Sequence, residues 1–519
     1  VQIGDPITQK KMIDFLLEAR DLGLFEGITD NGAGGLSSSV GEMARESGGC
    51  RMDLSKAPLK YPGLKPWEIL ISEAQERMTL SVAPKKIKAL QDLALKREVE
   101  VSVIGEFTKT GFFHILHGET TVAFLEMEFL HDGLPKLVLE AEWKTPVHPK
   151  VPDSVFQIHD HAEALKQILS RPNVASKEFW VRQYDHEVQA RTVVKPFEGP
   201  HRDGPSDAAV IRPVYASQQG LVVACGLAPR YSDLDARAMT LASVDEAVRN
   251  IVATGGDPKT LTGLDNFCWP DPVAGPDNPD GSFKMAQLVR SNEALQEICL
   301  AYGIPLISGK DSMKNDYGKG ADRISVPPTL LFTAAARIPD VRLAMTSPFK
   351  KTGSSIYLLG RTLSELGGSE FLSGKGFVGN AAPTVDLKTN FKMYQAFHKA
   401  ILKGLVLAAH DLSDGGLGVA LAEMCFGGML GAEIDLSKVP GSKTLGSVEI
   451  LYSESQGRLL AEVSPGKQKA FESLLRNIPF AKIGATHSDS VLQIKSGGNL
   501  VLSTSLAGLK AAWKNTLIF

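Results

Sequence analysis

The chain is poor in cysteine, and the cysteines that it has are scattered. Five of its 519 residues are cysteine, and no two of them have Cys-x-x-Cys spacing. This pattern argues against a dithiol redox motif and against the common structural zinc sites. A disulfide-rich secreted scaffold is excluded as well, so we expect reduced thiols and a cytoplasmic protein.

Long apolar runs and a strong net charge are also absent. No apolar stretch approaches the roughly 20 residues that span a bilayer, and no secretion signal is recognisable. The formal net charge is −3, so no basic field would attract nucleic acid. With 43% hydrophobic residues the composition is that of an ordinary globular protein, and its length suits about three domains.

One stretch, residues 409–418, combines carboxylates with paired glycines. It reads Ala-His-Asp-Leu-Ser-Asp-Gly-Gly-Leu-Gly and separates two apolar runs, which predicts a strand-to-helix turn. Glycines allow a close backbone approach, N–H groups at a helix start favour phosphate, and Asp carboxylates favour Mg²⁺. Turns of this composition that bind nothing are nevertheless common.

The same pattern occurs earlier in the chain, at Thr29-Asp30-Asn31-Gly32-Ala33-Gly34-Gly35-Leu36. Asp30 and Asp411 are 381 positions apart, and at this one offset several other residues match without a gap. Ser72-Glu73-Ala74-Gln75-Glu76-Arg77, for example, matches Ser453-Glu454-Ser455-Gln456-Gly457-Arg458. A chance register of this length is improbable, so we infer the duplication of a whole domain.

Composition and the repeat divide the chain into four parts. Residues 1–143 and 346–519 hold the two copies of a larger domain, and residues 153–345 form a smaller one. Residues 144–152 contain three prolines and are typical of an extended linker. Because the repeated unit starts close to Val1, we expect that an N-terminal part of the protein is missing.

Two patterns in the smaller domain are ambiguous. In the helix predicted for residues 235–254, Glu246 and Asn250 share a face, which suits metal ligands but also a solvated surface; from spacing alone we favour the surface. Gly309-Lys310-Asp311-Ser312 fails as a P-loop, because Asp311 stands where Ser or Thr should follow Lys310. A Gly-Lys turn that contacts phosphate in another geometry remains open.

Three motifs are together similar to those of a known family. They are His-Asp-Leu-Ser-Asp-Gly-Gly-Leu, Trp-Glu-Ile-Leu-Ile-Ser-Glu-Ala-Gln-Glu-Arg-Met and Gly-Lys-Asp-Ser-Met. In this combination the chain resembles, over essentially its whole length, the phosphoribosylformylglycinamidine synthases of the aminoimidazole ribonucleotide synthetase-like superfamily. The resemblance implies a ligase of purine biosynthesis. Using ATP, it would convert formylglycinamide ribonucleotide to formylglycinamidine ribonucleotide through an iminophosphate that ammonia attacks.

The resemblance also implies a fold. It is an α/β fold of two duplicated halves, each with a smaller and a larger domain, arranged about a pseudo-two-fold axis around a central β-barrel. Residues 1–143 would be the larger domain of the first half, and the remainder would be the second half. The first smaller domain, with the family's catalytic histidine in a His-Asn-His-Pro motif, would be absent.

For the first half, the resemblance implies a substrate site and a Mg²⁺ ligand, Asp30. The residues expected to bind the substrate are Gln2, Glu73, Ala74, Gln75 and Ser312. Gly309 is expected near the nucleotide, whereas Lys310 departs from the Asn metal ligand of one branch of the family.

For the second half, the resemblance implies an auxiliary site that holds ADP tightly and does not react. The expected nucleotide-binding residues are Lys177, Ser206 and Ser413. The expected Mg²⁺ ligands are Asp207, Glu246, Asn250 and Asp411, so the face that spacing alone assigns to solvent becomes a metal-binding face.

No cysteine lies in a Gly-x-Cys-x-Gly elbow of the kind that a glutaminase nucleophile requires. The resemblance therefore implies that a separate glutaminase subunit supplies ammonia and that a small bridging subunit takes part. We expect no nucleic-acid or membrane partner. Two alternatives stay open: another enzyme of the same ATP-binding superfamily, and a scaffold that binds nucleotide without turnover.

Overall fold

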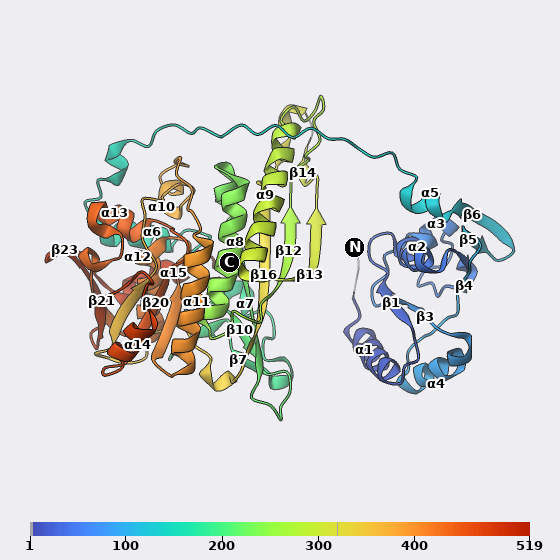
Figure 1. The fold of residues 1–519 in the computed structure, drawn as a ribbon, viewed down its shortest axis with the longest axis horizontal. Coiled ribbons are helices and arrows are strands. Elements are labelled where there is room, and N and C mark those ends of the chain that lie inside the picture. Colours follow the sequence, from blue (N-terminus) through green and yellow to red (C-terminus); the bar gives the residue numbers. More distant parts are fainter. Residues whose placement is uncertain (1–3, 319, 519) are drawn as a thin grey trace. The chain divides into compact units, whose positions relative to one another are not determined.

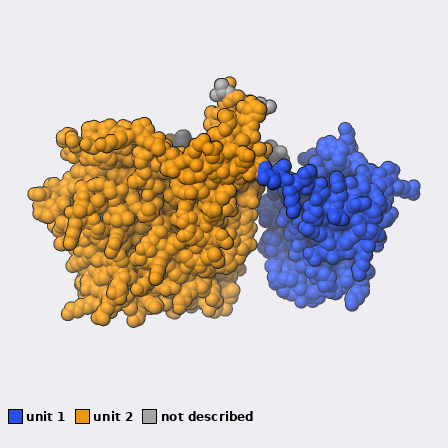
Figure 2. Space-filling model, turned by 45° about the horizontal axis from the view of Figure 1, so that its top comes forward, with its two compact units in different colours: residues 1–138 blue, residues 139–519 orange. Residues whose placement is uncertain are grey.

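The computed structural model describes residues 4–318 and 320–518, so Gln2, an expected substrate-binding residue, lies outside the described range. Figure 2 colours two compact units, residues 1–138 (unit 1) and 139–519 (unit 2). The expected linker, residues 144–152, contains no helix or strand. Within the described part of the chain, every helix is too short or too polar to cross a membrane.

Unit 1 is an α/β unit whose strands form two separate sheets. In one sheet β1 (Gly27–Asp30) pairs antiparallel with β3 (Met78–Ser81). The other sheet has the order β4-β2-β5-β6, with bounds Gly105–Phe107, Cys50–Asp53, Phe112–His117 and Thr120–Glu126. The helices are α1 (Pro6–Asp21), α2 (Gly35–Ser47), α3 (Pro66–Leu70), α4 (Ile87–Arg97) and α5 (Met127–Asp132).

Local signals explain why α1 forms where it does. The Asp5 side chain caps its start by accepting hydrogen bonds from the N–H groups of Ile7 and Thr8, and proline occupies the first turn. Phe15 and Ala19, four residues apart, are buried against α4. The helix ends at Asp21, and Gly23 just beyond it has a φ of 61°, which glycine adopts most easily.

Unit 2 begins with the short helices α6 (His161–Leu169) and α7 (Glu178–Val181) and then builds a six-stranded sheet. The strand order is β13-β12-β16-β11-β10-β7, with bounds Leu306–Ser312, Thr262–Cys268, Thr329–Ile338, Gly220–Leu227, Ala209–Ile211 and Thr192–Val194. Helices α8 (Ala236–Ala253) and α9 (Gly281–Tyr302) accompany this sheet (Figure 1). The sheet is open, and the strands of the described chain form no closed barrel. Two small hairpins complete this part: β8 (Phe197–Glu198) with β9 (Gly204–Pro205), and β14 (Asp316–Tyr317) with β15 (Ile324–Ser325).

The structure decides against one alternative that the sequence leaves open, the Gly-Lys turn at residues 309–312. Gly309 and Ser312 do not lie in a turn, because both belong to β13 at the open end of the sheet. β13 pairs in parallel with β12, and most of its residues are exposed. Polar residues on an exposed edge concealed the strand pattern.

The last part of unit 2 has a seven-stranded sheet with the order β18-β20-β17-β21-β19-β22-β23. The bounds are Val406–Asp411, Leu459–Val463, Ser355–Leu359, Phe480–His487, Gly431–Asp435, Val491–Ser496 and Asn499–Ser505. Its helices are α10 (Glu370–Ser373), α11 (Leu387–Leu402), α12 (Gly416–Gly428), α13 (Ser447–Tyr452), α14 (Gln468–Leu474) and α15 (Leu506–Lys514).

Helix α8 connects the two sheets of unit 2. It packs against β11 and β16 of the first sheet and also contacts β18 and α11 (Figure 1). It is buried on almost all sides, and its Val244 and Val248 share one hydrophobic cluster with Tyr394 and Leu459 of the last part. Because one core crosses position 345, the two domains expected in this unit are packed into a single body.

The duplication is visible in the order of the strands. β1, β3, β4, β2, β5 and β6 of unit 1 follow the order of β18, β20, β21, β19, β22 and β23 of unit 2. The helices correspond as well, since α1 and α2 start 381 positions before α11 and α12. β17, in the middle of the larger sheet, has no counterpart among the described residues of unit 1.

Candidate functional site

The turn at residues 412–415 joins β18 to α12 and carries the carboxylates that the sequence singled out. Gly415 and Gly416 have φ values of 76° and 64°, which favour glycine. A Cβ atom on Gly416 would come within 2.4 Å of the Ser453 carbonyl oxygen. The Gly415 N–H donates to Glu454 Oε1 over 2.9 Å, so the loop that follows α13 holds the turn in place.

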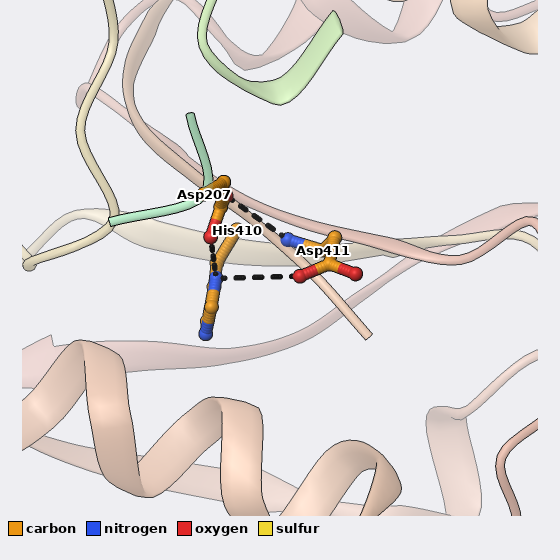
Figure 3. A group of neighbouring side chains, drawn as sticks. All are labelled: Asp207, His410 and Asp411. Carbon is orange, nitrogen blue, oxygen red and sulfur yellow. Dashed lines mark hydrogen bonds and ion pairs between the residues drawn. The ribbon is translucent and has the colours of Figure 1, made fainter. Parts of the chain in front are cut away.

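Three polar side chains meet at the end of β18 (Figure 3). His410 Nδ1 lies 2.6 Å from Asp207 Oδ1, and the Asp411 N–H donates to Asp207 Oδ2 over 3.3 Å. One ligand atom from each of Asp207, His410 and Asp411 lies within 4.8 Å of the others, as in groups that hold a metal ion. Burial raises the pKa of Asp207, since it penalises the charged carboxylate.

His410 is enclosed by carboxylates. Its Nε2 lies 3.0 Å from Glu423 Oε2, on the side opposite Asp207. Burial alone would lower the pKa of His410, but the Asp207 and Glu423 carboxylates raise it well above the usual value. Both ring nitrogens therefore have a carboxylate partner, which would make His410 a partner of Asp207 and Glu423 rather than a metal ligand.

A buried arginine fixes Asp411 from the other side. Arg249 and Asp245, one turn apart on α8, form a fully buried ion pair of 2.8 Å, and Arg249 Nη2 lies 3.3 Å from Asp411 Oδ2. Asp245 also accepts hydrogen bonds from the hydroxyl groups of Tyr302 and Tyr394. This network connects α8, α9, α11 and β18, and so it holds Asp411 in position without a ligand.

Glu246 and Asn250 point from α8 toward the same region, and the solvated-face interpretation of them is wrong. Asn250 is 7% exposed, and its Nδ2 donates to the Cys225 carbonyl. Its Oδ1 is buried and has no hydrogen-bond partner among the described residues. Burial and the charge of Asp411 raise the pKa of Glu246 well above its usual value. An orphaned amide oxygen beside mutually repelling carboxylates is a donor set that fits a divalent cation.

Glu454 is the other buried carboxyl of the site. It is 1% exposed and accepts hydrogen bonds from the Tyr231 hydroxyl and from the Glu370 and Gly415 N–H groups. Burial and then the neighbouring Asp414 raise its pKa to about 8. The site therefore holds more carboxyl groups than its arginine and histidine could neutralise if all of them were ionised.

The remaining second-half candidates surround this group. Lys177 is exposed, and its Nζ bonds to the carbonyl oxygens of Asn173 and Ala175. Burial of part of its chain lowers the pKa of Lys177, whereas Asp414 and Glu423 raise it. Ser206 Oγ donates to the Ala208 carbonyl, and the Ser413 carbonyl accepts from Gly416 in the turn.

In unit 1 the corresponding loop keeps its form but is open to solvent. The Gly32 N–H donates to Asp30 Oδ1 over 2.7 Å, and the Gly34 N–H lies 3.4 Å from Glu73 Oε1. Asp30, Glu73 and Gln75 are exposed, and Ala74 is half-buried. From the sequence alone, the alternation of Glu73, Gln75 and Arg77 predicts an extended stretch with these side chains on one face. This prediction is wrong, because the segment 72–77 is a loop in which Glu76 adopts a φ of 52°.

Within unit 2, the remaining candidates form no described hydrogen bond with the carboxylates at the end of β18. Gly309 and Ser312 lie on β13, where Ser312 Oγ bonds to Asn315, and no described hydrogen bond joins them to Asp207 or Asp411. Sequence reasoning missed His410, Arg249 and Glu454 as functional residues. His410 and Glu454 stood inside the repeated motifs, whereas nothing in the sequence marked Arg249.

Comparisons with known proteins agree with the duplication. The AIR synthase related protein C-terminal domain matches residues 1–117 and again 351–495, and the corresponding N-terminal domain matches residues 205–327. The chain is thus an α/β protein of the AIR synthase related class.

Closer relatives define the family within this class. Phosphoribosylformylglycinamidine synthase subunit PurL of Thermoplasma acidophilum is 31% identical to the chain, with 100% of this chain and 66% of the relative covered. The corresponding values for Alkaliphilus metalliredigens are 33%, 100% and 67%. The chain belongs to the family of phosphoribosylformylglycinamidine synthase subunit PurL, and it spans about two thirds of the length of these relatives.

Solved structures show the same fold. Thermotoga maritima PurL complexed with FGAR superposes with a TM-score of 0.64 at 22% identity, over 94% of this chain and 66% of that one. PurLQS from the same organism gives a TM-score of 0.63 at 23% identity, over 94% of this chain and 68% of that one.

Proposed function

We propose that the chain is part of an ATP-dependent C–N ligase that converts formylglycinamide ribonucleotide into formylglycinamidine ribonucleotide in purine biosynthesis. Family membership supports this reaction, because the relatives carry the name phosphoribosylformylglycinamidine synthase subunit. Solved relatives are described as complexes with FGAR, with ATP and with ADP. The two halves of the chain would divide the work between an open site in unit 1 and a closed site in unit 2.

The observation that carries the proposal is the charge imbalance of the unit 2 site. Asp207, Glu246 and Asp411 supply carboxylates, and Asn250 presents a buried oxygen that lacks a donor. These four residues would hold Mg²⁺, which would offset the charge of a nucleotide's phosphates. Lys177, Ser206 and Ser413 lie around them and would bind the nucleotide itself. The network through Arg249 keeps Asp411 in place beforehand, as a tightly held, non-reacting ADP requires.

The open site of unit 1 would contribute to the chemistry. Asp30 would bind Mg²⁺ there, and the residues proposed to bind substrate are Gln2, Glu73, Ala74, Gln75 and Ser312. Gly309 would lie near the nucleotide, and the catalytic histidine would come from a domain of the kind that residues 205–327 match. The protein's own groups would orient the formyl amide and exclude water while ammonia replaces the oxygen.

Each unit exposes apolar side chains on a surface that another domain could cover, and this supports a pseudo-two-fold assembly around a barrel. Ile13, Leu17 and Ile28 of unit 1 are each more than 40% exposed. Their counterparts at the 381-residue offset are Tyr394, His398 and Ala409, all buried in unit 2, where α8 and α9 contact α11 and α8 contacts β18. In unit 2, β13 presents exposed Leu306 and Ile307 at an open sheet edge. A second smaller domain would cover the first surface and close the second into a barrel, with domain limits at 1–143, 153–345 and 346–519.

Ammonia would come from a separate glutaminase subunit, with a small bridging subunit in the complex. The relatives are named as subunits, and one solved structure is described as PurLQS, which supports a multi-subunit enzyme.

Calorimetric titration of the chain with Mg-ADP tests the assignment of the two sites. Asp411→Asn should weaken binding at least about 100-fold, the effect of losing a charged ligand, whereas Asp30→Asn should leave it unchanged. At a nucleotide concentration of 100 times the dissociation constant, binding should add about 2.7 kcal/mol to the free energy of unfolding of the wild type. Asp411→Asn should lose this stabilisation, and Asp30→Asn should keep it.

Turnover completes the test, measured with ammonia, ATP and formylglycinamide ribonucleotide on the shortest form of the protein that is active. Asp30→Asn should cost about 2–4 kcal/mol of transition-state stabilisation. If Asp411→Asn keeps its nucleotide and loses only turnover, the roles of the two halves are reversed. Nucleotide binding without any turnover would favour the scaffold alternative.

A further inference from the structure

Unit 2 contains a cavity of about 660 Å³ to which the proposed ligase reaction assigns no role. Three segments line it: residues 151–161 up to the start of α6, residues 364–381 around α10, and residues 446–449 at the start of α13. Figure 1 shows α6, α10 and α13 in the same part of unit 2. None of the described residues that line the cavity is proposed to bind metal, nucleotide or substrate. A cavity of this size suits a small organic ligand.

Hydrogen bonds hold the walls of the cavity in place. His148 donates its N–H to Asn380 Oδ1 over 2.9 Å, and its carbonyl accepts from Asn380 Nδ2 over 3.1 Å. This pair ties the first wall to the second. The Glu449 carboxylate joins the second wall to the third, because it accepts from the Ser364 hydroxyl and from the Gly446 N–H. A ligand would therefore lose little binding free energy in ordering the walls.

The lining combines apolar surface with hydrogen-bond acceptors and carries no positive charge. Its larger apolar side chains are those of Val151, Phe156, Ile158, Leu366, Leu372 and Val448. Asp153 and Glu449 add carboxylates, and no arginine or lysine of the described chain lines the cavity. A phosphate group would find no cation here, so the cavity does not suit a nucleotide or a sugar phosphate. It suits an uncharged molecule that donates hydrogen bonds.

An aromatic ladder stiffens the apolar side of the cavity. Phe156 stacks on Phe371, and Phe371 stacks on Tyr452, with ring centroids 6.5 and 5.2 Å apart. Phe156 therefore has a fixed ring on the lining, against which a flat ligand ring can pack.

His161 brings a ring nitrogen without a partner to the cavity. Its Nδ1 is buried and forms no hydrogen bond with any described residue. Burial lowers the pKa of His161, which favours a neutral ring with one donor and one acceptor nitrogen. A buried polar atom without a partner is destabilising, and a ligand group that bonds to Nδ1 would remove this cost.

We propose that this cavity binds an uncharged ligand with a flat ring and several hydrogen-bond donors, the chemistry of a purine nucleoside. The ring would pack on the apolar wall beside Phe156 and bond to His161 Nδ1. The sugar hydroxyls would donate to Asp153. The lack of a lining cation would select against the phosphorylated forms of the same nucleoside.

Adenosine is the probe, titrated into the full chain by calorimetry without Mg²⁺. We expect one equivalent to bind and hydrogen exchange in residues 153–161 to slow, because the ligand packs on this wall. Gly446→Leu should weaken binding at least about tenfold by filling the cavity. Gly446 has a φ of −77°, which any residue adopts, and a Cβ atom there would meet only Glu449 Oε2, at 3.5 Å. Gly275→Leu, at an open position outside the cavity, is the matched control and should bind as the wild type does.

A second variant tests the polar contact. His161→Phe keeps a flat ring and removes both nitrogens, and it should weaken adenosine binding about tenfold. His159→Phe, at an exposed position that does not line the cavity, should leave binding unchanged.

Asp411→Asn separates this site from the proposed nucleotide site. It should keep adenosine and lose Mg-ADP, so the two proposals can fail separately. In this variant AMP should bind at least about tenfold more weakly than adenosine. Four results would each overturn the proposal: no adenosine binding, adenosine binding that survives both Gly446→Leu and His161→Phe, adenosine binding that Asp411→Asn abolishes, and equal affinities for adenosine and AMP.

Discussion

The two copies of the larger domain have similar backbone conformations at the strand-to-helix turn and differ in the elements that pack on it. Asp30 and Asp411 end equivalent strands, and Gly34 and Gly415 make the same left-handed turn, with φ values of 83° and 76°. Each glycine N–H also faces the same acidic side chain, Glu73 in one copy and Glu454 in the other. The second copy is covered by α8 of its own unit and Asp411 is 5% exposed, whereas no described helix of unit 1 takes that place and Asp30 is exposed. The same turn can therefore be an open site or a closed one, depending on the domain that packs on it.

The two copies also differ at one position in the loops 72–77 and 453–458. Gly457 and Glu76 occupy equivalent positions, and both adopt a left-handed conformation, with φ values of 68° and 52°. In unit 2 the Gly457 N–H donates to the buried Asp245. In unit 1 the Glu76 side chain accepts from the Asp5 N–H. The second copy uses the position to join two domains, and the first copy uses it within its own unit.

The largest effect should come from removing the buried cation that only unit 2 possesses. Arg249→Met leaves Asp245 and Asp411 without their common partner in a site that holds more carboxyl groups than cations. We expect a loss of about 4 kcal/mol in the free energy of unfolding of unit 2, measured by chemical denaturation.

The matched control is an exposed ion pair on unit 1. Arg45 and Asp132 are 3.5 Å apart with more than 60% of each side chain exposed. Arg45→Met should change stability by no more than about 0.5 kcal/mol. Equal losses in the two variants would show that burial under α8 does not set the difference between the copies.

Exchanging the residue types at positions 457 and 76 should give the next largest effect on stability. A Cβ atom on Gly457 would lie 2.2 Å from Asn390, whose Nδ2 bonds to Asp245. Gly457→Glu therefore displaces Asn390 and adds a carboxylate beside Asp245, which we expect to cost about 3 kcal/mol. The reverse change, Glu76→Gly, relieves a left-handed side chain and should stay within about 1 kcal/mol. Denaturation curves of both variants decide this, and a tolerated Gly457→Glu would contradict the packing described here.

Local elements of the fold were predictable because their causes are local. The N-cap at Asp5, the glycine at the end of α1 and the strand-to-helix turns all follow from residues within a few positions of each element. The duplication was readable for the same reason, since each copy repeats these local signals. The loop at 72–77 was not predicted, because no sequence signal indicates a left-handed backbone conformation at a glutamate.

The environment of the site could not be read from spacing. The sequence correctly predicts that Glu246 and Asn250 share one face of a helix, but whether that face of α8 meets solvent depends on β18 and α11, which lie more than 130 residues further along the chain. Only the family resemblance predicted that Asp207 and Asp411 belong to one site, because no sequence pattern around either residue indicates the other. The role of Arg249 depends on the charges around it, and these are known only once the chain has folded.

A smaller effect, but one specific to the closed copy, is the pH dependence of unit 2 without Mg²⁺. The pKa of Glu454 is about 8, above its value in the unfolded chain, so the folded state binds the additional proton between about pH 4.5 and 8. Stability should therefore fall as the pH rises through this range, by at most about 1.4 kcal/mol per pH unit for this group. Asp414 also faces Glu454, and burial and then the neighbouring Glu370 raise its own pKa to about 7, so it adds a dependence of the same sign.

Denaturation at several pH values tests this dependence. Glu454→Gln should flatten the profile, and saturating Mg²⁺ should reduce its slope by replacing protons as the counter-charge. Glu73→Gln, in the open copy, is the matched control and should leave the profile of unit 2 unchanged. A profile that is already flat in the metal-free wild type would mean that Glu454 is ionised in the folded state.

The smallest effect concerns a feature that the two copies share. Asp386 caps α11 by accepting from the Thr389 N–H, as Asp5 caps α1 by accepting from Ile7 and Thr8. Asp386→Ala should lower the stability of unit 2 by about 1 kcal/mol, the usual cost of an N-cap, and Asp5→Ala should lower that of unit 1. Asp386→Asn, which keeps an accepting oxygen, should recover most of the loss, as should Asp5→Asn. Thermal unfolding of each unit measures these changes. Because both helices begin with the same local signal, both copies should respond with the same sign. A loss in one copy alone would mean that the covering domain, and not the repeated sequence, also determines where these helices begin.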